Sequence, residues 1–212
     1  TGRRWLQGYL PLTIFSIFSL FVLYLSLTKS VLRTWLSEGI KTLRSHKRLV
    51  IGTLLGLYGI FFLGSFLGSQ LPNECRDSVV TLIETTITAV GATEAYGSGN
   101  VVRAATVTFY QNFVVVAASL TGIFALLFGI PAYILSASSF FIQGIPFGLL
   151  GAFSGPNLLF VLILVFLELT AYFLVVAGGG ILLATIIRKG FRSYPVAARK
   201  LFMIFPIVLI LL

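Results

Sequence analysis

Long apolar runs separated by short polar segments dominate the chain. The runs at residues 9–28, 49–71, 104–130 and 156–187 each reach the roughly 20 residues that a helix needs to cross a bilayer. Their apolar positions are continuous and lack the two-residue alternation of barrel strands. The pattern predicts an all-α polytopic membrane bundle of about five to six transmembrane helices.

Two further apolar segments are less regular. Residues 132–151 contain Pro146 and several Ser and Gly residues, so we expect this fourth pass to be kinked, discontinuous or re-entrant. Residues 201–212 begin a sixth helix. Because this run is shorter than a bilayer requires, we expect the sixth helix to be cut short.

The polar segment at residues 29–48 has its own pattern. It holds six basic residues and one acid, with apolar residues at steps of three and four. This pattern predicts a basic amphipathic helix at the membrane interface, which either binds anionic lipid or, more simply, connects two spans in the cytoplasm. We therefore divide the chain into residues 1–48, a first transmembrane helix plus this connector, and residues 49–212, the main bundle.

The charges predict an orientation. Basic residues gather again at residues 188–200, whereas residues 72–103 hold four acids and two bases. By the positive-inside rule, residues 29–48 and 188–200 are cytoplasmic and residues 72–103 are external, forming a helix on the membrane face and a turn at residues 95–100. The same rule explains the net charge of +9 without nucleic acid.

Small residues recur at helical spacing within the spans. Such residues let helix backbones approach closely in lipid, where packing drives association. They predict helix-packing faces at Gly52, Gly56, Gly64, Gly68, Ala118, Gly122, Ala125, Gly129, Gly144, Gly148 and Gly178.

One acid interrupts the last long span. Glu168 lies midway along residues 156–187, where burying a charge is costly and an ionisable residue is a functional candidate by default. Counting depth at about 1.5 Å per residue brings Asn112 and Gln143 to a similar level. We expect these three to form an intramembrane polar cluster in which a neutral Glu168 faces the interior and donates a hydrogen bond. The cluster is either a proton- or ion-responsive site or structural glue.

No pattern in the sequence indicates catalysis. Metalloprotease, nucleophile-elbow and phosphate-loop motifs are missing, and His46 lies in the basic connector. The single Cys and single His leave no metal-ligand cluster. We therefore expect a protein that is not an enzyme, with no metal and no cofactor.

Several motifs from about residue 44 onward resemble the stage II sporulation protein M family. A helix ends in closely spaced glycines, and Phe and Asn enter a small-residue helix that ends at a Pro. A Gln-Gly pair stands where the family has Asn-Gly, and a Glu-Leu-x-Ala sequence precedes a small-residue run. These motifs occupy residues Gly59–Gly68, Phe109–Pro131, Gln143–Gly144 and Glu168–Gly180. Where the family has Pro-His-Gly before the Glu, this chain has Ile163, Leu164 and Val165.

The resemblance implies a non-catalytic scaffold or assembly subunit in the plasma membrane of a bacterium or archaeon. Its expected partners are membrane lipid and other membrane proteins or further copies of the chain, held through the small-residue faces and the external segment. A transporter or permease-like subunit with Glu168 in its path is the alternative. A water-filled cavity that reaches Glu168 would favour transport, and a closed bundle would favour the scaffold.

Overall fold

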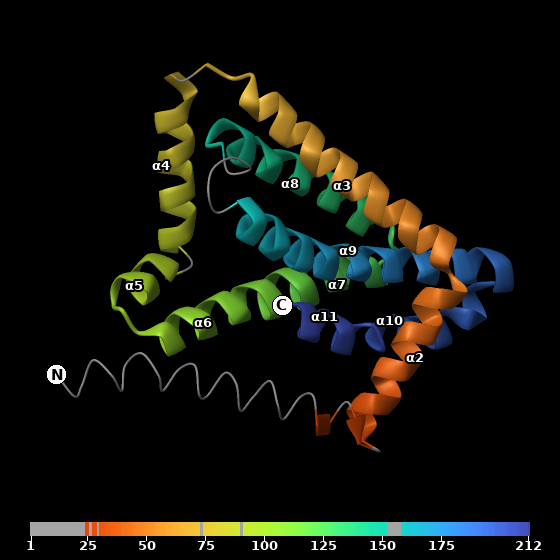
Figure 1. Ribbon diagram of the computed structural model, residues 1–212. Helices are drawn as coiled ribbons and strands as arrows, with labels where there is room; N and C mark the ends of the chain where they lie inside the picture. The colour runs from red at the N-terminus through yellow and green to blue at the C-terminus, as the bar shows by residue number, and fades with distance from the viewer. Residues whose placement is uncertain (1–23, 26, 29, 73, 90, 152–157) are drawn as a thin grey trace, which may run out of the picture.

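The computed structural model describes residues 24–212 except for 26, 29, 73, 90 and 152–157. The described residues form helices and no strands (Figure 1). The predicted first helix at residues 9–28 lies almost wholly outside them. Among the described residues, five helical segments are long and apolar enough to cross a membrane, namely Lys47–Ser69, Val102–Leu126, Ile130–Leu149, Leu162–Lys189 and Phe191–Leu211. The prediction of a multi-pass helical membrane bundle is confirmed.

The basic connector forms helix α2 (Val31–Ser45). The side chain of Ser30 caps its start by accepting a hydrogen bond from the backbone N–H of Arg33 at 3.1 Å. Its inner face buries Gly39 and Thr42, and a Cβ at Gly39 would overlap the backbone carbonyl of Met203. The helix is therefore packed against the C-terminal part of the chain as well as being amphipathic.

Helix α3 (Lys47–Ser69) and helix α8 (Ile130–Leu149) lie side by side and run in the same direction (Figure 1). Their glycines make the contact possible, because a Cβ at any of them would overlap backbone of the other helix. These glycines are Gly64 and Gly68 on α3 and Gly144 and Gly148 on α8. Parallel packing agrees with two passes in one direction separated by one pass in the opposite direction.

Gly52 and Gly56 do not belong to this interface. A Cβ at either position would meet no described atom within 4 Å, and both residues are exposed. The sequence-based assignment of these two glycines to helix packing is wrong for the described structure. Spacing alone identified them, whereas the buried face of α3 in these turns runs through Val50, Thr53 and Leu57 and leaves both glycines outside it.

Helix α9 (Leu158–Lys189) lies at the centre of the bundle. Residues 171–182 are buried, and Gly178, predicted to pack, has the side chains of Leu201 and Ile204 against it. The hydroxyl of Tyr58 on α3 donates to the carbonyl of Phe166 at 2.8 Å, and Leu49 lies against Gly180. These pairs make α9 antiparallel to α3.

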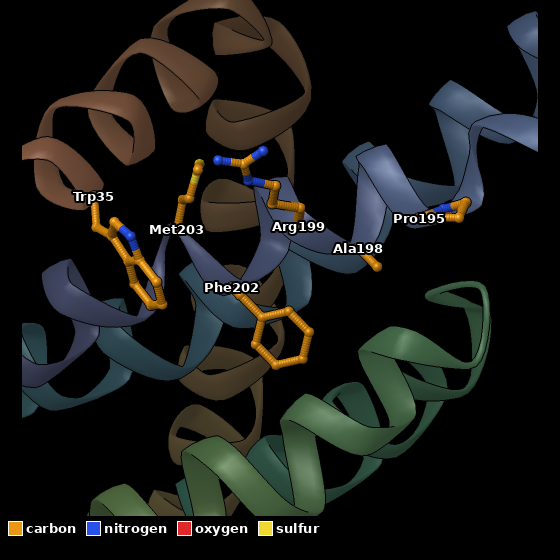
Figure 2. Close-up of a pocket in the computed structure, with 6 residues that line it drawn as sticks. All are labelled: Trp35, Pro195, Ala198, Arg199, Phe202 and Met203. Atoms are coloured by element: carbon orange, nitrogen blue, oxygen red, sulfur yellow. The ribbon is translucent and has the colours of Figure 1, made fainter. Parts of the chain in front are cut away.

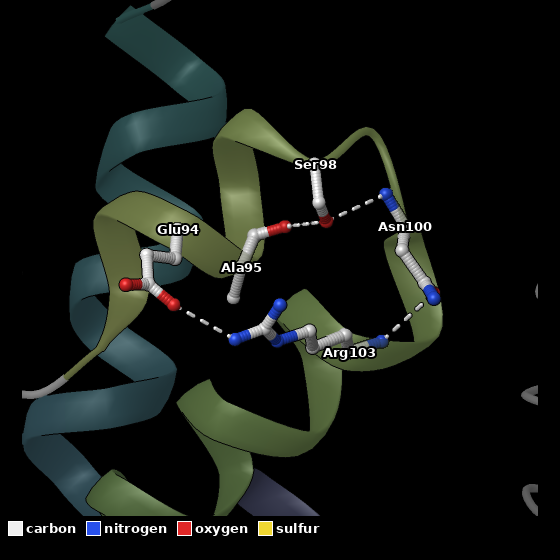
Figure 3. Close-up of polar contacts among 5 residues, drawn as sticks. All are labelled: Glu94, Ala95, Ser98, Asn100 and Arg103. Atoms are coloured by element: carbon white, nitrogen blue, oxygen red, sulfur yellow. Dashed lines mark hydrogen bonds and ion pairs between the residues drawn. The ribbon is translucent and has the colours of Figure 1, made fainter.

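The predicted external segment forms helix α4 (Glu74–Ala89) and the short helix α5 (Ala92–Gly97). In Figure 1, α4 stands apart from the spans and connects the end of α3 to α5. The turn predicted at residues 95–100 begins later than expected, because residues 92–97 belong to α5. At this corner the Asn100 side chain caps the next helix through the backbone N–H of Arg103, and Arg103 pairs with Glu94 at 3.0 Å (Figure 3).

The third span is not a uniform α-helix. It consists of α6 (Val101–Phe109), a π-helix at Tyr110–Thr121 labelled η1 here, and α7 (Gly122–Leu126). The wider turns change which residues share a face, so Ala117 is fully buried while Ala118 is only half-buried. The predicted stripe is therefore corrected at Ala118, whereas Gly122, Ala125 and Gly129 are buried. Positive φ angles at Phe128 and Gly129 end the span before α8.

The fourth pass is a single helix, α8, with Pro146 inside it, and the main irregularity lies in the preceding span. After α9, a 3-10 turn at Phe191–Ser193 leads into α10 (Tyr194–Phe202) and α11 (Phe205–Leu211). Part of the predicted basic connector thus joins the sixth apolar run. Together they give a 21-residue candidate span, so the expectation of a sixth run too short to cross is corrected.

Candidate functional site

The intramembrane acid has a polar partner on the third span. The side-chain amide of Asn112, in the π-helix, donates to Oε1 of Glu168 at 3.1 Å. Both residues are half-buried. This hydrogen bond joins the third span to α9. Nearer the C-terminal ends of the same two helices, Gly179 contacts Ala125, so the two helices run in the same direction.

A second donor comes from the same helix as the acid. The hydroxyl of Tyr172, one turn after Glu168, also donates to Oε1, at 3.0 Å. The buried ring of Tyr172 stacks on Phe140 of α8 with centroids 5.8 Å apart. Because Tyr172 is four residues after Glu168, the two side chains share one face of α9. This spacing is the sequence signal that could have assigned Tyr172 to the cluster.

Gln143 does not join the predicted cluster. Helix α8 buries a stripe at Ala132, Ser136, Phe140 and Gly144, and Gln143 lies outside this stripe with its side chain exposed. It forms no hydrogen bond with Asn112 or Glu168 in the described part of the chain. Gln143 was predicted to lie at the same membrane depth as Glu168. Depth does not determine contact, because the direction of a side chain also depends on the rotation of its helix.

The hydrogen bonds of Glu168 are one-sided. Oε1 accepts both donors, whereas Oε2 has no partner among the described residues. We expected the carboxyl to donate to a backbone carbonyl or to the side chain of Asn112 or Gln143, and at Asn112 the amide donates to the carboxyl instead. Oε1 can accept these bonds in either protonation form of the acid.

Glu168 also marks a boundary along α9. Before it, most of the described apolar side chains are open, with Leu159 71% exposed and Leu164 52% exposed, although Val165 is buried. After it, the helix is enclosed, and Phe173 and Val175 are fully buried. The carboxyl therefore lies where the tightly packed half of the bundle gives way to an open apolar surface.

Other tyrosines link the spans in ways that the sequence reading missed. Tyr58 of α3 bonds to the hydroxyl of Thr170 at 2.6 Å, and Tyr133 of α8 bonds to Thr53 at 2.5 Å. Tyrosine in an apolar run is ambiguous, because its ring is apolar and only packing decides whether its hydroxyl finds a partner.

Two cavities lie at α2, away from the acid. One, of about 310 Å³, is lined by Trp35 and by residues of α10 and its end. The other, of about 600 Å³, is lined by residues between Ser30 and Lys41. Neither includes Glu168, Asn112 or Tyr172 in its lining. No group of three or more metal-binding side chains comes together within the described residues.

Comparison of the chain with known protein families, with curated proteins and with solved structures found no match.

Proposed function

We propose that the protein is a non-catalytic scaffold or assembly subunit of the membrane, of the kind that its resemblance to the stage II sporulation protein M family implies. This proposal rests on the unequal hydrogen bonding of the two carboxyl oxygens of Glu168. Its Oε1 is held by Asn112 and Tyr172, and its Oε2 has no partner among the described residues.

A polar atom at this depth needs a partner. Lipid chains offer no hydrogen bond, and an intramembrane acid pairs with protein or lines a water-filled space. Neither described cavity reaches Glu168. With the carboxyl neutral, Oε2 carries the proton, and a hydrogen-bond acceptor on a second membrane protein would satisfy it and would also cover the open apolar side chains at the start of α9.

The partner surface that we propose differs from the one expected from sequence. Four glycines are used within the chain, in the contact between α3 and α8, and so are not free to bind another protein. We therefore place the partner surface on the exposed apolar side chains around Glu168, drawn from α9 and the third span. These are Leu159, Ile163 and Leu164 on α9 and Tyr110 and Val114 on the third span.

Transport through the bundle is the second candidate. It is favoured by the π-helix that carries Asn112, since such irregular turns are frequent at functional sites. In this reading Glu168 exchanges a proton or binds an ion. Neither cavity at α2 includes Glu168 in its lining, which favours the scaffold instead.

Affinity purification in mild detergent tests the proposal with three variants. Glu168→Leu removes the carboxyl and should lose the co-purified membrane protein, whereas Glu168→Gln keeps an acceptor and a donor and should retain it. Glu84→Gln is the matched control, because it neutralises an exposed carboxyl on α4. Retention of the same partner by Glu168→Leu would contradict the scaffold proposal. Partner retention with loss of a transport activity in Glu168→Gln would favour the second candidate.

A further inference from the structure

The cavity between α2 and α10 is a pocket with an apolar interior and a basic rim. Its lining comes from two segments far apart in the chain (Figure 2), with a volume of about 310 Å³. The lining residues are Trp35 on α2 together with Pro195, Ala198, Arg199, Phe202 and Met203.

Local packing creates this pocket. Gly39, one turn after Trp35, allows α2 to approach the backbone of Met203 closely. On α10, Pro195, Ala198 and Phe202 recur at steps of three and four and share a face. The small side chain of Ala198 forms part of the pocket lining together with the ring of Trp35.

Positive charge predominates around the pocket. The segments at residues 29–48 and 188–200 carry eleven basic residues and one acid, Glu38, which pairs with Lys41 at 2.8 Å. Arg199 is exposed and pairs with no carboxylate in the described part of the chain. An apolar pocket with an unpaired guanidinium at its rim complements a molecule with an anionic head and an apolar body.

We infer that this pocket binds one anionic phospholipid of the bilayer. The phosphate accepts hydrogen bonds from Arg199, and the glycerol end with the first part of an acyl chain fills the space between Trp35 and Phe202. A volume near 310 Å³ is at the small end of ligand sites, which suits part of a lipid rather than a whole one. Trp35, 44% exposed, is the residue type that favours the level of lipid headgroups.

The experiment reads lipid contact from the fluorescence of Trp35. The chain has two tryptophans, so Trp5→Phe leaves Trp35 as the sole emitter. The full chain is placed in bilayers of phosphatidylcholine with a minor share of phosphatidylglycerol, and bromine, which quenches on contact, is carried by one lipid or the other. Quenching by brominated phosphatidylglycerol should exceed its share of the bilayer by about fivefold, the preference expected for one arginine beside an anionic lipid.

Variants separate a built pocket from general attraction to the basic surface. Arg199→Gln should reduce quenching to the bulk share, whereas Lys200→Gln, the same change one residue away and outside the lining, should leave it unchanged. Ala198→Leu should reduce it by filling the space. If Ala198→Leu fails to fold, Arg199→Gln still tests lipid binding at the pocket, because the Arg199 side chain is exposed and packs little.

Three results would overturn the inference. Quenching by each brominated lipid in proportion to its share of the bilayer would show an ordinary lipid-facing surface. No quenching by either would show that protein covers the pocket. An equal loss in Arg199→Gln and Lys200→Gln would show attraction to the whole basic surface without a site.

Discussion

Gly64 of α3 and Gly144 of α8 occupy matching positions in a local two-fold arrangement of two parallel helices. Gly64 packs against the backbone carbonyl of Phe141, and Gly144 packs against the backbone carbonyl of Phe61. The 80-residue separation of the two glycines also separates Thr53 and Tyr133, whose hydroxyls share a hydrogen bond. Close backbone approach of this kind is the main source of helix association in lipid.

Replacing Gly144 by Leu should separate α3 from α8. The new side chain would overlap backbone, which cannot rotate away as a side chain can, so we expect a loss of at least about 1–3 kcal/mol in stability. Thermal unfolding of the detergent-solubilised chain measures the change. Gly56→Leu is the control, because its added atoms enter open space among the described residues. Equal melting of the two variants would contradict the packing described here.

Gly122→Leu should release the C-terminal helix from the third span. A Cβ at Gly122 would lie 3.1 Å from the ring of Phe205, and a larger side chain would displace that ring. We expect a lower melting temperature and faster proteolysis after residue 200. Ile123→Leu, at a position 55% exposed, should change neither. A stable Gly122→Leu variant would show that α11 is not held by this contact.

Cysteine labelling should place Ser98 outside and Ser193 inside. Ser98 precedes α6, whereas Ser193 lies beside Tyr194, whose hydroxyl bonds to the carbonyl of Leu126 at the far end of the same span. The two sites are therefore at opposite ends of the third span. Labelling of intact cells needs a Cys75→Ser background, because Cys75 is a free thiol. Labelling on the reverse sides would invert the orientation predicted from charge.

The Glu168 cluster should tolerate a neutral isostere better than an apolar residue. Glu168→Gln retains an acceptor for Asn112 and Tyr172 and should melt close to the unchanged chain. Glu168→Leu leaves both donors without their acceptor, at an average cost of about 0.6 kcal/mol for each intramembrane hydrogen bond. Thermal unfolding compares the variants. Greater stability of the Leu variant would remove any structural role for the acid.

The ion pair between Glu94 and Arg103 should contribute little to stability. Both side chains are more than half exposed, and such pairs are worth about 0–1 kcal/mol and weaken in salt. Glu94→Gln should therefore shift the melting temperature by only a few degrees at most. Asn100→Ala is the informative comparison, since loss of a helix cap costs about 0.5–2 kcal/mol. A larger effect for Glu94→Gln than for Asn100→Ala would reverse this ranking.

The sequence by itself determined the membrane class and the approximate spans. Length and continuous hydrophobicity are sufficient for this, because the bilayer requires each crossing segment to satisfy its own backbone hydrogen bonds. It also identified Glu168 and Asn112, since polar residues stand out in an apolar run. The glycines that pack α3 against α8 were recognisable from their spacing, although Gly52 and Gly56 had the same spacing without the contact.

Only the tertiary structure decided which polar and small residues meet. The π-helix rotates the third span so that Ala117 replaces Ala118 in the interior, and local propensity does not specify such a turn. Helix rotation directs Gln143 away from Glu168 and brings Tyr172 to it. The pocket at Trp35 depends on contact between segments more than 150 residues apart, which arises only when α2 packs on α10. Periodicity describes one helix at a time, whereas these features depend on how helices are turned against each other.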